Sequence, residues 1–553
     1  MQAIRNWFKS GDPWVWLNAG AVSISLLLVL GLLVLITVRG FGHFWPGGIL
    51  EFGYREPGGE MVTVLGEIAD RETVARKQLT GVDELIPVDQ KVVDRYLVKV
   101  GNRDFFGVDF RWVLVPAMSG ISYPDTAMAV ERREWGNMYG YLKTVMQEGQ
   151  DIGGEDPWRT LQETLKRTNT IFDKIRHIEK DLIGKINYNI EQLRLKRRGY
   201  ELRGIADTAL YEELERKRAV WNGEYSHLTD ELAALYTEME QYRMVATLAG
   251  GREVTVPLSR IVRAYRPNAM GRFAKLGLYF GRLWEFVSDD PREANTEGGI
   301  FPAIFGTVTM VLVMAVLVTP FGVIAAVYLR EYARQGPLTR AIRIAVNNLA
   351  GVPSIVYGVF GLGFFVYFLG GSIDQLFFPE ALPAPTFGTP GLLWAALTLA
   401  ILTLPVVIVA TEEGLTRVPR EIREGSLALG ATKAETLWRT VFPMTASAMM
   451  TGLILAVARA AGEVAPLMLV GVVKLAPSLP LDGNTPFLHL DRKFMHLGFH
   501  IYDVGFQSPN VDAARPLVYA TSLLLVLIIV ILNLTAIRIR NRLREKYRAA
   551  EQH

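Results

Sequence analysis

The 553-residue chain contains no cysteine. It therefore has no disulfide, thiolate metal site or cysteine nucleophile, although this absence alone leaves the compartment open. The sequence also lacks the pattern G-x-x-x-x-G-K-[ST], so the chain cannot supply the phosphate-binding loop of an ATPase. Its 59 basic and 56 acidic residues nearly cancel, and a net charge of +3 does not suggest nucleic-acid binding.

Long apolar runs dominate what is present. Apolar residues make up 50% of the chain and charged residues 21%, which predicts membrane spans together with a sizeable soluble part. A cleaved signal peptide is the alternative reading of the first run, but its length and the absence of a clear cleavage site favour an uncleaved span. By length and apolarity, six spans are predicted: Leu17–Val38, Phe301–Leu329, Ala345–Leu369, Leu392–Ala410, Met444–Val473 and Leu517–Ile537.

Arginine and lysine indicate the orientation. They gather before the first span, in residues 330–344 and after Arg538, whereas residues 370–390 contain no basic residue. With six spans all the basic segments share one face, which the positive-inside rule makes cytoplasmic. This predicts a cytoplasmic N-terminal segment and first span in residues 1–40, an external insert in 41–298, a membrane domain in 299–540 and a basic cytoplasmic tail in 541–553.

The external insert is too long and too patterned to be a loop. Alternating apolar residues predict a strand-rich base in residues 50–135 and 250–268. Between them, apolar residues recur at three- and four-residue steps, which predicts an antiparallel coiled-coil hairpin in 157–248 that turns between Gly199 and Asp207. The insert is therefore expected to be an α+β domain.

A charged segment, residues 411–443, separates the fourth and fifth spans on the cytoplasmic side. Pro419 can begin a helix, Gly430 can end it in a left-handed conformation, and Thr432 with Glu435 fits a capping box that starts a second one. The pattern predicts two short helices at nearly a right angle. Two interpretations remain open: an amphipathic linker with Trp438 among lipid headgroups, or a helix that docks into a groove of another protein.

The stretch EGSLALGATKAETLWRTVFP resembles the EAA loop of ABC-importer permeases. Glu424, Gly430 and Pro443 fit the spacing of that motif, and the positions that depart from it are Gly425, Ser426, Thr440 and Phe442. Together with NNLAGVPSIVYGVFGLG, TPFGVIAAVYLREYA and LAVARAAGEVAPLMLVG, it makes residues 299–540 resemble phosphate-importer permeases of the PstA type. The first 298 residues resemble the N-terminal extension of the longer members.

The resemblance implies a membrane all-α fold of the ABC-importer permease type, with six transmembrane helices, in a bacterial inner membrane. It implies a transport subunit rather than an enzyme, which forms half of a pathway for inorganic phosphate and binds no cofactor itself. The implied partners are a sister permease, an ATPase dimer that uses ATP, an extracytoplasmic phosphate-binding protein and membrane lipid. The contacts with the ATPase would come from Leu427, Leu429, Leu437 and Trp438.

Charges within the predicted spans are candidates for the pathway. Arg459 and Glu463 stand one helical turn apart, and a charge in a membrane is costly unless it is paired or hydrated. The planar fork of an arginine suits an oxyanion, which favours a role in transport over the alternative, a structural ion pair that locks two helices. Glu412 and Asn347 are further candidates, with an interfacial carboxylate and a packing amide as the plain alternatives. His489, His496 and His500 are expected at the surface.

Two other functions remain open from the sequence. The EAA-type loop does not encode the substrate, so another oxyanion such as sulfate or molybdate is an alternative to phosphate. A membrane-anchored sensor or scaffold that uses the external hairpin is the alternative from another class, but it has no need of Arg459 or of a docking loop.

Overall fold

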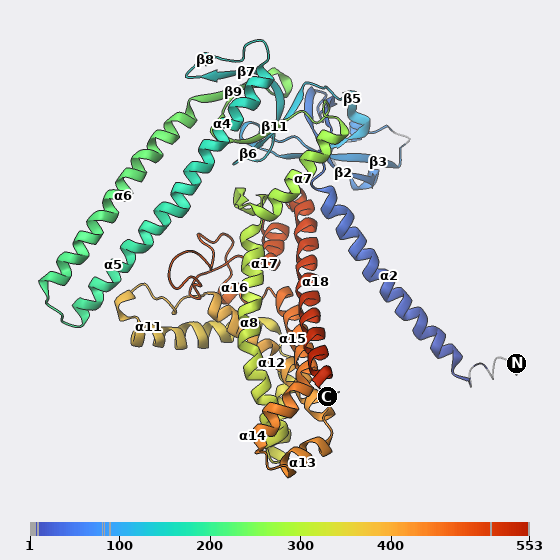
Figure 1. Ribbon diagram of the computed structural model, residues 1–553. Coiled ribbons are helices and arrows are strands. Elements are labelled where there is room, and N and C mark those ends of the chain that lie inside the picture. Colours follow the sequence, from blue (N-terminus) through green and yellow to red (C-terminus); the bar gives the residue numbers. More distant parts are fainter. Residues whose placement is uncertain are drawn as a thin grey trace.

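The computed structural model describes residues 7, 10–79, 81, 83–87, 90–508 and 511–550. Parts of the predicted N-terminal segment and residues 551–553 of the predicted basic tail lie outside these ranges. Figure 1 shows two sheets and a pair of long helices at one end of the molecule, and the charged helices α13 and α14 at the other.

Within the described residues, six helices are long and apolar enough to cross a membrane. The helix α12 lies at their centre and packs against α8 and α15 around Met314, Trp394 and Leu399. None of the apolar window of α2 is buried, and α2 contacts α18 where Gly40 lies against the backbone of Tyr519 and Ala520. The six are α2 (Asp12–Gly42), α8 (Phe301–Val327) with η8 (Tyr328–Tyr332), α10 (Ser354–Phe360) with η9 (Gly361–Gly370) and α11 (Gly371–Phe377), α12 (Leu392–Arg417), α14 (Lys433–Thr436) with η11 (Leu437–Val441) and α15 (Phe442–Gly462), and α18 (Val511–Ala550).

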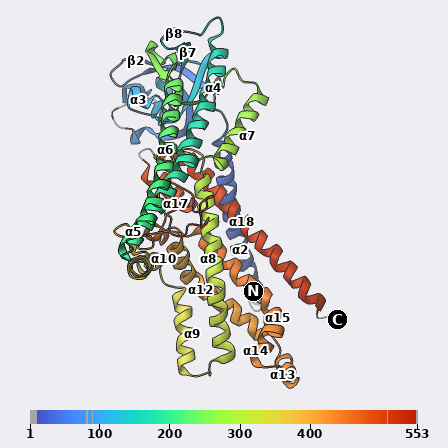
Figure 2. The ribbon, with the colours of Figure 1, turned by 60° about the vertical axis from the view of Figure 1, so that its left-hand side comes forward.

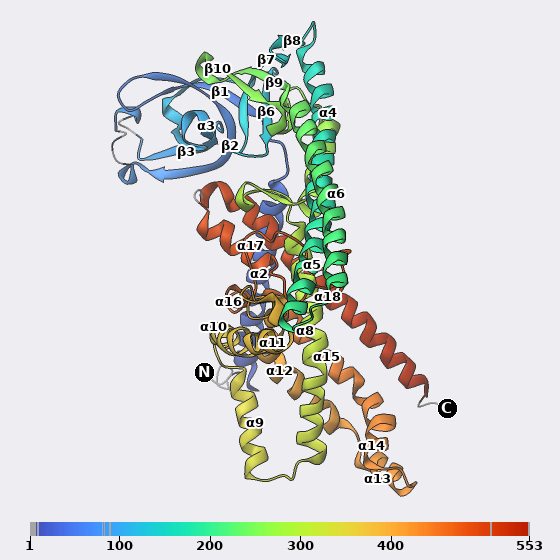
Figure 3. The same ribbon diagram turned by 90° about the vertical axis from the view of Figure 1, so that its left-hand side faces the viewer.

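The start predicted for the third span is wrong. The helix α9 (Pro337–Leu349) ends before Gly351 and Pro353, and α10 begins at Ser354. Proline lacks a backbone N–H and restricts the residue before it, so one helix does not continue through this point. Figures 2 and 3 show α9 alongside one half of α8, and Figure 1 shows α11 running across the direction of α8. Asn347 therefore belongs to α9 and not to the third span.

The fifth span also differs from its prediction at both ends. It begins earlier, because α14, η11 and α15 follow one another without a break, and Pro443 lies within the first turn of α15. It ends at Gly462, because Glu463 is extended and the chain then turns into the short helix α16 (Leu467–Val470). Before α18 come the short α17 (Leu497–Tyr502) and η12 (Asp503–Gln507). The predicted basic tail continues α18 as far as Ala550.

Residues 49–265 contain two antiparallel sheets. The first has the order β4-β3-β2-β1-β5 and the second the order β10-β9-β7-β6-β11, with β8 paired to β7. The predicted base of residues 50–135 and 250–268 therefore lacked β7 and β9, which lie outside these ranges. Residues 250–268, predicted as one strand-rich piece, contain β10 and β11, which lie on opposite edges of the second sheet. The strands are β1 (Ile49–Arg55), β2 (Met61–Ala75), β3 (Val92–Lys99), β4 (Phe110–Leu114), β5 (Met118–Ser122), β6 (Ala127–Arg132), β7 (Met138–Gln147), β8 (Gln150–Asp151), β9 (Tyr242–Thr247), β10 (Glu253–Pro257) and β11 (Ile261–Tyr265).

Two antiparallel helical arms extend from the second sheet (Figures 1 and 2). The first arm is α4 (Pro157–His177), η4 (Ile178–Ile183) and α5 (Gly184–Leu202), and the second is α6 (Thr208–Glu240). Near the sheets the arms bury Ile171, Ile175, Ile178, Leu232 and Met239 against one another. Towards the tip, Leu182 and Tyr225 of the predicted seam are exposed, so a coiled-coil seam does not run the full length of the arms.

The helix α7 (Arg272–Ser288) and a two-stranded ribbon of β12 (Pro291–Arg292) and β13 (Glu297–Gly298) connect the sheets to α8. A cluster of Phe44, Phe286, Ile300 and Leu517 packs where α2, α7, α8 and α18 meet. The segment α7 thus lies between the sheets and the ends of three apolar helices.

Candidate functional site

Arg459 and Glu463 lie together at the end of α15. The Nε atom of Arg459 is 3.6 Å from the Oε1 atom of Glu463, and their side chains are 35% and 20% exposed. Arg459 is in the last helical turn, and Glu463 is the residue that caps the helix. The ion pair is thus partly shielded, and the Arg459 side chain still has accessible surface beside its contact with Glu463.

A cavity of about 440 Å³ lies between α9 and α12. Asn347 and Glu412 both line it, together with Arg343, Glu413 and Arg417. The four predicted pathway residues therefore fall into two groups, because neither Arg459 nor Glu463 lines this cavity.

Arg343 is the residue that sequence reasoning missed. Its Nε atom is 3.2 Å from the Oε1 atom of Glu412, and its other nitrogens donate to the carbonyl oxygen of Leu329 and the side chain of Gln335. The cation that faces Glu412 therefore comes from α9 of the same chain. The sequence signal that could have found Arg343 is the pair of Arg340 and Arg343 in the segment that forms the amphipathic helix α9.

The charged segment between the fourth and fifth spans turns at Gly430, as predicted, and we call α13, this turn and the first turns of the following helix (residues 420–441) the corner. The helix α13 (Arg420–Ala428) follows Pro419, and Gly430 has a φ of 89°, in the left-handed region. The hydroxyl of Thr432 accepts from the Glu435 N–H while the Glu435 carboxylate accepts from the Thr432 N–H, which completes a capping box. The corner is followed by one long helix rather than by a second short one.

Most of the predicted contact residues lie on the outside of this corner. Glu424 and Leu427 are exposed, Leu429 is 91% exposed and Trp438 is 73% exposed. Leu437 is buried against Val327, Leu415 and Val441, so it stabilises the corner from within and we exclude it from the contact surface. Pro443 is partly buried in the continuous helix.

Polar contacts bind the corner to the end of α8. The Nη2 atom of Arg423 donates to the carbonyl oxygen of Leu415 at 2.5 Å and lies 3.1 Å from the Oε1 atom of Glu331. The ammonium of Lys433 donates to the carbonyl oxygen of Glu331 and lies 4.6 Å from the centre of the Tyr332 ring. These contacts connect α13 and α14 to α12 and to η8, which continues α8.

The expectation for the histidines is wrong. His489, His496 and His500 are all buried, and burial lowers the pKa of His496 to about 3. His489 Nε2 is 2.9 Å from Asp482 Oδ1. In the described part of the chain, no group of His, Asp and Glu side chains is arranged to hold a metal ion.

The family model for "Binding-protein-dependent transport system inner membrane component" matches residues 318–548, which include every predicted site residue. The chain is 35% identical over 246 residues to "Phosphate transport system permease protein PstA 1" of Mycobacterium tuberculosis (strain CDC 1551 / Oshkosh), covering 44% of this chain and 71% of that relative. It is 38% identical over 194 residues to "Phosphate transport system permease protein PstA" of Mycobacterium leprae (strain TN), covering 35% of this chain and 58% of that relative.

The chain therefore belongs to the family of binding-protein-dependent transport system inner membrane components and is a permease subunit of this class. Among solved structures, it is similar to the MetNI methionine ABC transporter in an inward-facing conformation, with a TM-score of 0.34 and 17% identity over 48% of this chain and 98% of that one.

Proposed function

We propose that the chain is the permease subunit of an ATP-driven importer of inorganic phosphate and forms half of its pathway. The observation that carries the proposal is the similarity to relatives named phosphate transport permeases, one of which the chain covers over 71% of its length. The Arg459–Glu463 pair lies within the family region and supplies a guanidinium fork suited to an oxyanion. In this proposal Arg459 meets the anion, and Glu463 holds the guanidinium in place between transport events.

The cavity between α9 and α12 is proposed as the cytoplasmic end of the pathway. Arg343 and Glu412 pair across it, so the passage is electrostatically neutral when no anion is present. Asn347 adds an amide that can donate to a passing anion. Arg417 lies at the same opening.

The corner of α13 and α14 is proposed as the contact with a separate ATPase dimer. The support is an exposed apolar surface of Leu427, Leu429 and Trp438 beside Glu424, held by a corner whose geometry depends on Gly430. A helix that presents such a face can fill a groove on a partner. Movement of the corner would reach the spans through Arg423 and Glu331.

We also propose the orientation and the remaining partners. Both described ends of the chain, near α2 and α18, would face the cytoplasm of a bacterial inner membrane, with the sheets and helical arms outside. A sister permease would complete the pathway, and an extracytoplasmic binding protein would deliver phosphate. The external arms lie on the side from which such a protein approaches.

The test is uptake of labelled phosphate by proteoliposomes that contain the complete transporter. Replacing Arg459 by alanine should lower uptake by about tenfold or more, since a tenfold loss corresponds to only ~1.4 kcal/mol of lost stabilisation. Arg340→Ala, an exposed arginine on α9, is the control and should transport normally. Unchanged uptake by Arg459→Ala at normal protein level excludes Arg459 from the pathway. Uptake of labelled sulfate or molybdate without uptake of labelled phosphate identifies another oxyanion as the substrate.

A further inference from the structure

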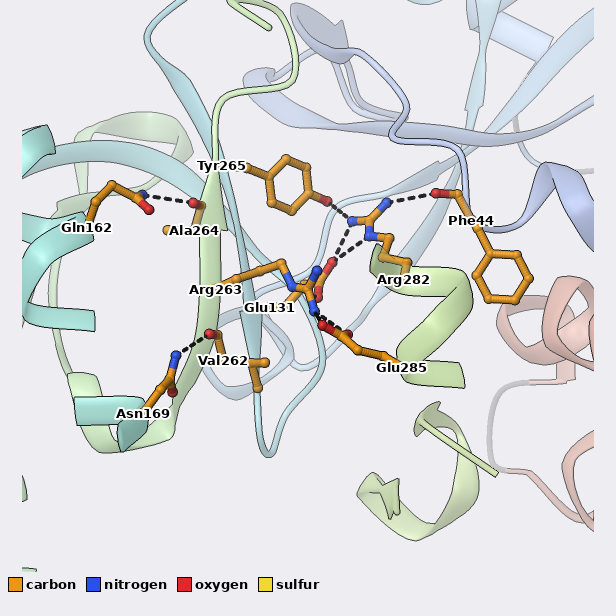
Figure 4. Close-up of polar contacts among 10 residues, drawn as sticks. All are labelled: Phe44, Glu131, Gln162, Asn169, Val262, Arg263, Ala264, Tyr265, Arg282 and Glu285. Atoms are coloured by element: carbon orange, nitrogen blue, oxygen red, sulfur yellow. Dashed lines mark hydrogen bonds and ion pairs between the residues drawn. The ribbon is translucent and has the colours of Figure 1, made fainter. Parts of the chain in front are cut away.

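The helix α7 directs two of its charged residues, Arg282 and Glu285, at the second sheet. Arg282 pairs with Glu131, and Glu285 pairs with Arg263, whose Nε atom is 2.9 Å from the second oxygen of Glu131. Figure 4 shows this network, with Arg282 also directed at the Tyr265 hydroxyl. These side chains are 13% to 33% exposed, so the polar face of α7 is used to bind the second sheet.

Four of its large apolar residues point the other way, while Tyr279, Leu283 and Phe286 pack inward against the neighbouring helices. Phe273, Leu276, Phe280 and Trp284 follow one another at steps of three, four and four residues, which places them on one face of the helix. Phe273 is 90% exposed and Trp284 is 70% exposed. Aromatic side chains bury about 150–250 Å² each when covered, so leaving this face in water forfeits a large stabilisation. A surface helix in water normally carries polar and charged side chains on its exposed face.

The second half of α7 is attached to the ends of two apolar helices. A guanidinium nitrogen of Arg282 donates to the carbonyl oxygen of Phe44, just after α2, and the ring of Tyr279 lies 6.0 Å from that of Trp45. One turn after Arg282, the carbonyl oxygen of Phe286 accepts from the N–H of Ile300, which directly precedes α8. The exposed face of α7 is therefore continuous with the exposed apolar surface at the end of α2, where Trp45 is 46% exposed.

We propose that α7 lies in the interface of the lipid bilayer, with Phe273, Phe280 and Trp284 among the acyl chains and headgroups. Membrane interfaces favour aromatic rings at the ends of spans and amphipathic helices parallel to the surface. A helix fixed in this way and paired to the second sheet sets the height of the whole external part above the membrane. The proposal needs only that α2 and α8 cross the bilayer, so it stands or falls separately from phosphate transport.

The absence of cysteine allows a direct test by site-directed spin labelling. Three exposed helical glycines have no atom within 4 Å of an added Cβ, so a label fits each without disturbing the aromatic residues: Gly31 on α2, Gly223 on α6 and Gly277 on α7. The single variants Gly31→Cys, Gly223→Cys and Gly277→Cys of the full chain are labelled in nanodiscs of phosphatidylethanolamine and phosphatidylglycerol. Collision rates with oxygen and with a water-soluble nickel complex are then measured.

At Gly277 we expect a high rate with oxygen and a low rate with nickel, close to the Gly31 reference and opposite to the Gly223 reference. A nickel rate like that at Gly223 shows a helix in water and overturns the proposal. Low rates with both reagents show cover by protein, as a second permease subunit would provide, and overturn it equally. Trp284→Cys repeats the measurement at a second position on the same face. Each variant is compared only if it elutes as the unmodified chain does in size-exclusion chromatography.

Discussion

At the scale of single residues, Arg423 and Glu331 control how the corner of α13 and α14 meets the membrane helices. Their side chains are 19% and 12% exposed, so each shields the other from a poorly hydrated environment. Removing one partner of such a pair leaves an uncompensated charge, at a cost of roughly 3–5 kcal/mol for a fully buried pair and less here. A displaced corner would still bind an ATPase, but would no longer pull on the end of α8.

We therefore predict that Arg423→Gln permits ATP hydrolysis by the assembled transporter while lowering phosphate uptake by about tenfold, or ~1.4 kcal/mol in coupling. The double exchange Arg423→Glu with Glu331→Arg should recover part of the uptake, because the attraction is restored in reverse. Arg420→Gln on the exposed side of α13 is the matched control. If the exchange behaves no better than either single variant, direct pairing does not transmit the movement.

Gly430 is the second residue whose role can be isolated. Its φ of 89° disfavours any side chain, and an L-residue held there costs about 1–3 kcal/mol. Gly425 is also exposed and equally free of neighbours, but lies in the helical turns of α13. We predict that Gly430→Val releases the ATPase in co-purification whereas Gly425→Val retains it. Equal retention by both variants would show that the angle of the corner does not matter for binding.

At the scale of the elements, α9 connects η8, which continues α8, to the start of α10. The forked guanidinium of Arg343 holds its position by reaching three acceptors on three segments: Leu329, Gln335 and Glu412. A lysine has one ammonium and no fork, so it cannot reach all three at once. Rotation of α9 about residues 350–353 would open or close the cavity beside it.

Arg343→Lys is accordingly predicted to lose uptake nearly as fully as Arg343→Gln, by about tenfold, although it keeps the charge. Arg340→Gln, one turn earlier on the exposed side of α9, should retain uptake. Thermal unfolding of the purified variants separates transport from folding, because the loss of uptake should exceed any loss of folded protein. Full activity of Arg343→Lys would mean that charge alone is required and that the fork has no role.

Local signals and long-range contacts explain which features the sequence could predict. The corner was predictable because the capping box of Thr432 and the left-handed glycine act within a few residues. All six spans were recognised from their apolarity, but the third was predicted to start too early because the apolar run continues on both sides of Pro353. The Arg343–Glu412 pair joins residues 69 positions apart, and β7 pairs with β9 although both helical arms lie between them in the sequence. Neither contact leaves a local pattern in the sequence.

At the scale of the whole molecule, the part with the sheets and arms contacts the membrane domain at several places, which include α7 and the amide of Asn295, which donates to the carbonyl oxygen of Lys474. Another is the start of α5, where the Tyr188 hydroxyl donates to the carbonyl oxygen of Thr485 and the Tyr188 ring lies 6.1 Å from that of His489. The receiving loop is held by Asp482, whose pKa burial raises but whose hydrogen bonds with Asn484, Arg492 and His489 lower to about 2. Asp482 is thus ionised at neutral pH, and its contacts with Asn484, His489 and Arg492 hold the loop without involving the arm.

The contact of Tyr188 with the loop is separated from the contacts of α7, so it should limit the movement of the arms relative to the loop. We predict that Tyr188→Ala raises amide hydrogen exchange by about fivefold in residues 184–202 and 482–492, as expected for losing ~1 kcal/mol of hydrogen bonding and ring contact. Tyr188→Phe keeps the ring beside His489 and should show a smaller rise. Tyr225→Ala, an exposed tyrosine on the other arm, should leave both segments unchanged. Exchange that rises in residues 184–202 but not in residues 482–492 would show that the Tyr188 contact does not order the loop. The position of the sheets and arms would then depend on α7.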